Sequence, residues 1–191
     1  FQPDFGFLTH TMAYADHADI CIKGNLIQPR AEGEIAFRLK SDLQGPGVTE
    51  LDVLNATKCI MPCFEIVDSR IEDWRIKIQD TISDNASCGV YVLGDTEIDP
   101  TGLDMANLEI KVYKNSALIS QGQGSAVQGN PLTAVAWLAN TLGAFDIPFL
   151  AGEVILSGSL VPLEPVQRGD KMHLELSGAG IESCTASCNF V

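Results

Sequence analysis

The chain has 191 residues, 46% of them hydrophobic and 19% charged, which is enough to bury one core and fits a single domain over residues 1–191. Lys and Arg number 12 against 25 Asp and Glu, and the net charge of −13 argues against nucleic acid or an anionic membrane as a partner. No apolar run reaches the roughly 18 residues that a membrane span needs. We expect a cytoplasmic protein.

The chain begins at Phe1 without a methionine, and the first residues lack the basic region and cleavage pattern of a signal peptide. We expect the natural protein to extend further upstream.

Short runs with strand-like alternation dominate the chain, and Gly, Pro, Asn and Asp separate them. In chain order, the predicted strands cover residues 33–40, 63–71, 89–95, 108–115, 116–124, 152–160 and 171–178. Lys114, Asn115 and Ser116 have the chemistry of a tight turn, so the fourth and fifth of these strands should form a hairpin.

Two stretches have helical patterns. The first begins at a cap-like Thr49 and covers residues 49–60. In the second, Asn130 can cap a helix that has Pro131 in its first turn and an apolar stripe as far as Gly143. We predict an α+β fold, mainly β, in which a few helices pack on mixed β structure.

Six cysteines allow two interpretations. Cys59 and Cys63 form one C-x3-C pair, Cys184 and Cys188 form a second, and Cys21 and Cys88 stand alone. This spacing does not fit a zinc knuckle, although a metal–thiolate site or two disulfides are the alternatives. We favour reduced thiols that act as small buried hydrophobic residues.

The most informative strand is the one that follows Pro29. Ile35, Phe37 and Leu39 alternate with polar or small residues, which is typical of a strand with one apolar face. Glu32 and Glu34 therefore share the opposite face. Neighbouring carboxylates repel each other and raise each other's pKa unless a positive charge lies between them.

Other reaction classes lack their motifs. The sequence contains no G-x-x-x-x-G-K-[ST], no H-E-x-x-H and no G-x-S-x-G, and the lone Gly122 to Gly124 motif is too weak to indicate a dinucleotide site. His10, His17 and His173 belong to no recognisable triad or ligand pair, so structural roles are expected for them.

A third carboxylate, Glu65, lies between Phe64 and Ile66 in another apolar strand. Together with Glu32 and Glu34 it predicts an all-oxygen site for Mg²⁺ or Mn²⁺. The alternative is that each of the three glutamates is merely solvated on an edge strand.

Residues 28–39, 62–94, 130–143 and 152–170 resemble the 2-hydroxypenta-2,4-dienoate (2-keto-4-pentenoate) hydratases of the fumarylacetoacetate hydrolase-like superfamily. The resemblance implies a β-roll core and a divalent metal, Mg²⁺ or Mn²⁺, held by Glu32, Glu34 and Glu65. It also implies the addition of water to a small 2-hydroxydienoic acid from the meta-cleavage degradation of aromatic compounds, which gives 4-hydroxy-2-oxopentanoate.

Further site residues follow from the same resemblance. Asp4 matches an acidic position that works with a lysine, which would precede Phe1. The predicted catalytic residues are Asp4, Asp80 and Lys77, and the predicted substrate-binding residues are Ser159 and Asn85. The structural alternatives are a turn residue for Asp4 and a surface charge for Lys77. Leu160 stands where relatives of the superfamily carry a proline, which leaves the geometry of the Ser159 loop open.

Two rival functions remain from the sequence. A 4-oxalocrotonate (2-oxo-3-hexenedioate) decarboxylase would use the same metal chemistry, and a non-catalytic binding subunit would not need all three carboxylates on one metal. The expected partners are further copies in a homo-oligomer and a paralogous decarboxylase or a downstream aldolase.

Overall fold

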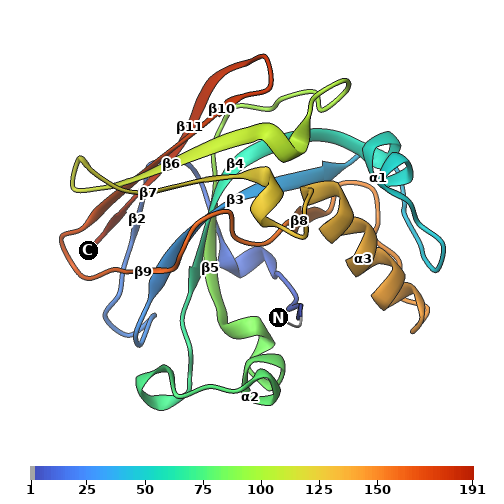
Figure 1. Ribbon diagram of the computed structural model, residues 1–191. Helices are drawn as coiled ribbons and strands as arrows, with labels where there is room; N and C mark the ends of the chain where they lie inside the picture. The colour runs from blue at the N-terminus through green and yellow to red at the C-terminus, as the bar shows by residue number, and fades with distance from the viewer. Residues whose placement is uncertain (1–2) are drawn as a thin grey trace.

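The computed structural model describes residues 3–191, which form two β-sheets flanked by a few helices (Figure 1). The first sheet has the order β1 (Ala13–Tyr14), β5 (Cys88–Leu93), β4 (Thr57–Val67), β3 (Arg30–Leu39) and β8 (Val154–Leu156), and β9 (Glu164–Pro165) also pairs with β3. The second has the order β2 (Ala18–Ile20), β11 (Ile181–Phe190), β10 (Lys171–Gly178), β6 (Leu108–Lys114) and β7 (Ala117–Gln123). The predicted α+β, mainly β class is confirmed.

Strand β3 lies inside its sheet, and both of its faces are buried. Ile35 and Phe37 belong to the main core, as the alternating pattern predicts. On the other face, Ala36 packs in a second apolar cluster with Met61 of β4 and Tyr91 of β5. Side chains on the polar face of β3 are therefore withdrawn from water as well.

Gly33 brings the second sheet close to β3. A Cβ atom at this position would lie 2.7 Å from Cδ1 of Ile110 and 2.8 Å from Cδ1 of Leu174, which come from β6 and β10. The absence of a side chain between Glu32 and Glu34 thus lets the two sheets pack directly over the core face of β3.

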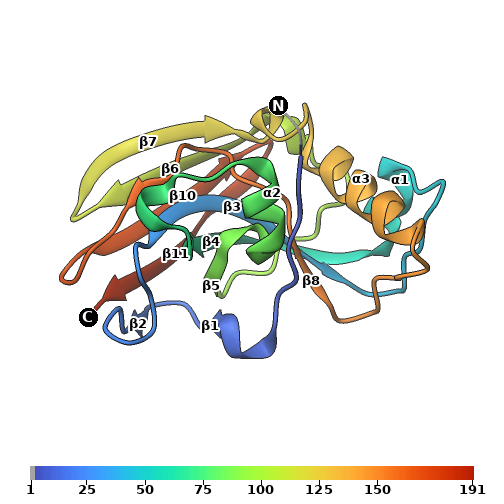
Figure 2. The same ribbon diagram turned by 90° about the horizontal axis from the view of Figure 1, so that it is seen from below.

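Helices α1 (Glu50–Ala56) and α3 (Pro131–Gly143) pack together at one end of the sheets, and α2 (Ile78–Ser83) lies apart from them (Figures 1 and 2). Asn130 caps α3 through its Oδ1 atom, which accepts a hydrogen bond from Leu132 N at 3.0 Å. Within residues 3–191, no helix is both long and apolar enough to cross a membrane.

The helix predicted over residues 49–60 is shorter in the structure. Thr49 and Asp52 form a capping box at its start, as the sequence indicates. The helix ends at Ala56, and Thr57 begins β4. The next residues pair with β3 and fill the core, so tertiary pairing overrides the helical pattern.

The predicted hairpin is present between β6 and β7, and Asn115 and Ser116 adopt φ values of 52° and 70° at its turn. Strand β11 was not predicted, because small residues such as Cys184, Ala186 and Cys188 make its buried face. All six cysteines are free, and five of them are buried, in agreement with the preferred interpretation.

Gly122 on β7 and Gly124 allow close packing and form no nucleotide-binding loop. A Cβ atom on Gly122 would lie 2.0 Å from the carbonyl oxygen of Leu160, and one on Gly124 would lie 2.0 Å from that of Met105. Backbone atoms cannot move aside as a flexible side chain would.

Replacing Gly122 by Ala should therefore lower the free energy of unfolding by about 1–3 kcal/mol, the usual cost of overpacking. Chemical denaturation would measure this loss, with Gln121→Ala on the same strand as the exposed control. Equal stabilities of the two variants would show that the contact with Leu160 is not tight.

Candidate metal centre and active site

Three glutamates from two adjacent strands meet at one point. Glu32 and Glu34 extend from the same face of β3, and Glu65 extends from β4 directly opposite Glu32 in the antiparallel register. One carboxylate oxygen from each of the three lies within 4.8 Å of the others. The structure thus brings together the three residues that the sequence predicts as metal ligands.

The surroundings of Glu34 fix the direction of its carboxylate. Its side chain is buried, and Oε2 accepts a hydrogen bond of 2.8 Å from the backbone N–H of Gly158. Gly158 follows β8 and has a φ of 100°, a conformation that favours glycine. The Gly158 loop therefore holds one oxygen of Glu34 and leaves the other available.

Burial and mutual repulsion disfavour the charged forms of these glutamates. Burial, followed by the charge of Glu65, raises the pKa of Glu32 from 4.5 to about 8. Burial and the charges of Glu65 and Glu32 raise the pKa of Glu34 well above its usual range, and burial also raises the pKa of Glu65. Among residues 3–191, no Lys or Arg forms an ion pair with any of the three.

The donor set fits a hard divalent cation. Mg²⁺ and related ions prefer carboxylate oxygens, and a cation among three carboxylates would remove the repulsion that raises their pKa values. The alternative, in which each glutamate is solvated on an edge strand, does not match the burial of Glu34 or the position of β3 inside the sheet.

Asp4 lies close enough to the cluster to act on it electrostatically. Its charge contributes to the raised pKa of both Glu32 and Glu65, and partial burial raises its own pKa. A carboxyl group whose pKa is raised, and which lies beside a polar cluster, can accept and donate protons as a general acid or base.

Ser159 comes next to the Gly158 loop and also reaches the cluster. Contact with its hydroxyl group lowers the pKa of Glu32, against the effect of burial. The hydroxyl group donates a hydrogen bond to the carbonyl oxygen of Val161, which holds the loop in a closed turn. Leu160 is buried inside that turn, so the loop is formed without the proline found in superfamily relatives.

Lys77 and Asp80 lie at the start of α2. The Asp80 carboxylate accepts a 2.9 Å hydrogen bond from the backbone N–H of Lys77, so Asp80 caps the helix. The Lys77 side chain is exposed at the surface. Asp80 therefore has a structural role at the helix end, and no contact of the Lys77 side chain with the cluster is seen among residues 3–191.

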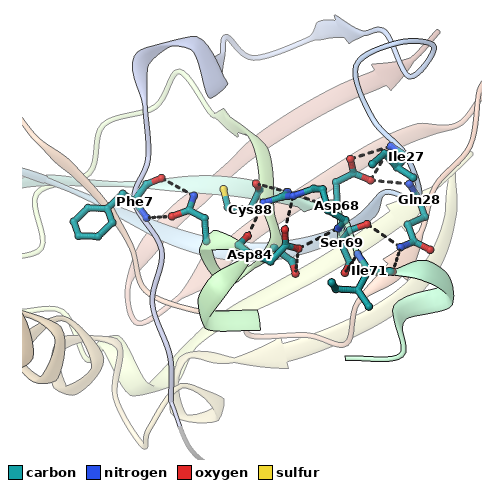
Figure 3. Close-up of polar contacts among 11 residues, drawn as sticks. Phe7, Ile27, Gln28, Asp68, Ser69, Ile71, Asp84 and Cys88 are labelled. Carbon is teal, nitrogen blue, oxygen red and sulfur yellow. Dashed lines mark hydrogen bonds and ion pairs between the residues drawn. The ribbon is translucent and has the colours of Figure 1, made fainter. Parts of the chain in front are cut away.

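Asn85 is engaged with the backbone of the N-terminal segment. Its Oδ1 accepts a 2.7 Å hydrogen bond from Phe7 N, and its Nδ2 donates a 3.0 Å hydrogen bond to Phe7 O (Figure 3). The Asn85 side-chain amide, predicted to bind substrate, thus uses its oxygen and one of its N–H groups in hydrogen bonds to the segment that carries Asp4.

Arg70, which forms an ion pair of 2.6 Å with Asp84, could not be predicted from local sequence patterns. Cys88 could not be predicted either, and its thiol, next to Glu65, lowers the pKa of that carboxyl group. Only the tertiary pairing of β4 with β5 brings Cys88 to the cluster.

Trp74 has a structural explanation. Its indole N–H donates a 3.0 Å hydrogen bond to Gln28 O, and the Arg30 guanidinium lies 4.4 Å from its ring centroid. Trp137 on α3 packs against Phe5, with 6.4 Å between the ring centroids.

Comparison with known proteins places this geometry in context. A family model described as fumarylacetoacetate (FAA) hydrolase C-terminal matches residues 1–186. The chain is 63% identical over 180 residues to a 2-hydroxyhexa-2,4-dienoate hydratase of Comamonas testosteroni, a match that covers 94% of this chain and 68% of that protein. It is 60% identical over 146 residues to a 2-hydroxypent-2,4-dienoate hydratase of Pseudomonas putida, which covers 76% of this chain and 66% of that protein.

A solved structure has the same fold. The 4-oxalocrotonate decarboxylase from Pseudomonas putida G7, complexed with magnesium and adipate, superposes with a TM-score of 0.91 at 31% identity, over 97% of this chain and 69% of that one. The chain spans about two thirds of the length of these relatives.

The affinity for a divalent cation should rise with pH. A carboxyl group whose pKa is raised on folding binds more protons in the folded chain, so the stability that it contributes is present below about pH 4.5 and is lost as the pH rises through about 8. A cation displaces these protons. Calorimetry should therefore show Mn²⁺ binding at least about tenfold tighter at about pH 8 than at about pH 6, with proton release.

The titration would be repeated in two buffers of different ionisation enthalpy, because the difference between the two measured heats gives the number of protons released. Binding that does not change with pH would show that the glutamates are already ionised in the metal-free protein.

Glu34→Gln should weaken Mn²⁺ binding by on the order of 100-fold or more, because one of three anionic ligands becomes neutral. The amide oxygen can still accept the hydrogen bond from Gly158, so the fold should persist. Removal of a buried, repelled charge should make the metal-free variant more stable than the parent chain at about pH 8.

Titration calorimetry and chemical denaturation would measure both effects, with the exposed Glu182→Gln as the matched control. Unchanged Mn²⁺ affinity in Glu34→Gln would show that the glutamate cluster is not the metal site.

Proposed function

This chain belongs to the fumarylacetoacetate hydrolase C-terminal family, and we propose that it carries the active site of a 2-hydroxydienoate hydratase, a hydro-lyase of aromatic-compound degradation. The reaction adds water to 2-hydroxypenta-2,4-dienoate, or to its six-carbon homologue, and gives a 4-hydroxy-2-oxo acid. The observation that carries the proposal is the convergence of Glu32, Glu34 and Glu65 in a chain 63% identical to a hydratase of this class.

Sequence identity favours the hydratase over the decarboxylase. The decarboxylase of known structure shares the fold at 31% identity, about half of the identity that the two hydratases share with this chain. A decarboxylase must also accommodate the second carboxylate of its substrate. Association with further copies, with a paralogous decarboxylase or with a downstream aldolase stays a prediction.

Glu32, Glu34 and Glu65 would hold Mg²⁺ or Mn²⁺, and the bound ion would supply Lewis-acid polarisation of the substrate's carboxylate and neighbouring oxygen. Magnesium and calcium are named in the complexes of the related decarboxylase, which supports an oxygen-loving divalent ion here. A binding subunit without catalysis would not need all three carboxylates, of which Glu34 is buried and the other two half-buried, on one metal ion.

The chemistry requires several proton transfers. The substrate loses a proton from its 2-hydroxyl group and gains one at C5, which leaves a 2-oxo-3-enoate. The oxygen of water then joins C4, and a proton joins C3. We assign these transfers to Asp4, because burial raises its pKa and its charge raises the pKa of Glu32 and Glu65.

We assign substrate binding to Ser159: its hydroxyl group, which acts on Glu32, would turn from the carbonyl oxygen of Val161 and donate its proton to the substrate carboxylate. Lys77 and Asp80, also predicted as catalytic from the sequence, have roles at the start of α2, so the proposal assigns no chemical step to them.

The first test uses the full-length protein with 2-hydroxypenta-2,4-dienoate and follows the loss of the dienol's ultraviolet absorbance with and without Mg²⁺ or Mn²⁺. The six-carbon dicarboxylic 2-oxo acid runs in parallel, and released carbon dioxide is captured. Metal-dependent loss of the dienol without carbon dioxide supports the hydratase. Carbon dioxide from the dicarboxylate alone would instead identify a decarboxylase, and silence on both substrates would favour a binding subunit.

Asp4→Asn should lower kcat by on the order of 100-fold or more, since an amide cannot transfer the protons, while Mn²⁺ affinity stays within a few-fold. Steady-state kinetics and calorimetry would measure the two quantities, with the exposed Asp95→Asn as control. Full activity in Asp4→Asn would return Asp4 to the role of a turn residue.

A further inference from the structure

The contact between Asn85 and the N-terminal segment is unusually close. Besides the two hydrogen bonds to Phe7, a Cβ atom on Gly6 would lie only 2.4 Å from the backbone oxygen of Asn85. The segment therefore lies directly on the turn at residues 85–87, and the N-terminal chain passes beside α2 in Figure 2. A larger residue at position 6 would force the two apart.

The turn that presents Asn85 has a conformation that L residues rarely adopt. Asn85, Ala86 and Ser87 have φ values of 57°, 55° and 56°, three consecutive left-handed residues without a glycine. Such a conformation persists only where its surroundings hold it, and it gathers at functional sites.

The side chains of Ser87, Asp84 and Arg70 hold the turn. The Ser87 hydroxyl group donates a 2.9 Å hydrogen bond to Asp84 Oδ2, and the backbone N–H of Arg70 donates a 3.0 Å hydrogen bond to the same oxygen. The Arg70 side chain forms the 2.6 Å ion pair with Asp84 Oδ1. The Asp84 side chain is 10% exposed, whereas the Arg70 side chain is 39% exposed, so water reaches the pair from the arginine side.

Arg70 also links the two ends of the segment that connects β4 to β5. Its guanidinium donates hydrogen bonds to the carbonyl oxygens of Asp68 at 2.8 Å and Cys88 at 3.0 Å (Figure 3). Asp68 directly follows β4, which carries Glu65, and Cys88 begins β5, which pairs with β4. The turn is thus anchored to β4 and to its neighbour β5.

The consequence concerns Asp4, which lies three residues before Phe7. Its carboxylate acts on Glu32 and Glu65, so its distance from them depends on where residues 4–7 are held. The Phe5 ring packs against Trp137 of α3, with 6.4 Å between centroids, and gives the segment its apolar anchor. The Asn85 amide supplies the polar anchor.

We propose that Asn85 is a positioning residue, whose side-chain amide clasps the backbone of Phe7 and thereby holds Asp4 beside the Glu32, Glu34 and Glu65 cluster. The proposal rests on the proposed function, because it takes Asp4 as the proton-transfer group. Arg70 and Asp84 act one step further away, by holding the left-handed turn that aims the amide.

The test variant is Asn85→Gly, because glycine keeps the left-handed conformation and removes only the amide. We expect kcat to fall by about 100-fold, the usual effect of a misplaced catalytic group, with KM and the Mn²⁺ dissociation constant within about twofold of the parent values. Exchange of the Phe7 amide hydrogen should accelerate at least about tenfold. Asn55→Ala, an exposed asparagine on α1, is the matched control and should change none of these quantities.

Asn85→Asp retains an acceptor for Phe7 N and should recover part of kcat, and Gly6→Ala should reproduce the loss by pushing on the same contact from the other side. Combining Asn85→Gly with Asp4→Asn should lower kcat little below that of Asp4→Asn alone, because both changes remove the same function.

Three results would overturn the proposal. The first is unchanged kcat despite faster exchange at Phe7, and the second is slow Phe7 exchange in Asn85→Gly. The third is a loss of Mn²⁺ affinity as large as the loss of kcat, which would indicate a general structural defect. Absence of hydratase activity in the parent protein would instead refute the proposed function, and exchange at Phe7 would still report whether the clasp exists.

Discussion

Repulsion among three carboxylates that are shielded from water is the constraint on which the rest of the structure depends. Glu32 and Glu65 face each other across β3 and β4, a pairing that destabilises a sheet when both residues are charged. The cost is tolerable only with a cation or with protons in place. The fold favours the charged forms of the glutamates only in part, through a hydrogen bond from Gly158 to Glu34, the Ser159 hydroxyl group beside Glu32 and the Cys88 thiol beside Glu65.

The two sheets and the loops between them all contribute to this point. Gly33 lets the second sheet pack against β3, and Gly122 lets β7 approach the loop that follows β8. That loop carries Gly158 and Ser159. Close packing at Gly33 and Gly122 therefore helps to fix the direction of the carboxylates, and the rigidity that a metal site requires comes from packing as much as from the ligands.

Much of the centre could be predicted from local patterns. Alternation in β3 places Glu32 and Glu34 on one face, and the apolar neighbours of Glu65 indicate a buried strand. What could not be predicted depends on contacts between distant segments. Nothing near Asn85 in the sequence points to Phe7, 78 positions away, and the partners of Arg70 are mostly carbonyl oxygens, which every residue has. The helix that ends at Ala56 shows the same limit, because pairing with β3 decides where β4 begins.

The burial of β3 on both faces limits how this protein can change in length. Deleting or inserting one residue within the strand would turn Ile35 and Phe37 towards the site and Glu34 into the main core, since neighbouring side chains point to opposite faces. A change of two residues would restore the faces, but it would shift Glu32 and Glu34 relative to Glu65 by about 6.6 Å along the strand, too far for one ion to contact all three. Related sequences should accept insertions at the hairpins and loops, while the spacing from Glu32 to Leu39 stays free of gaps.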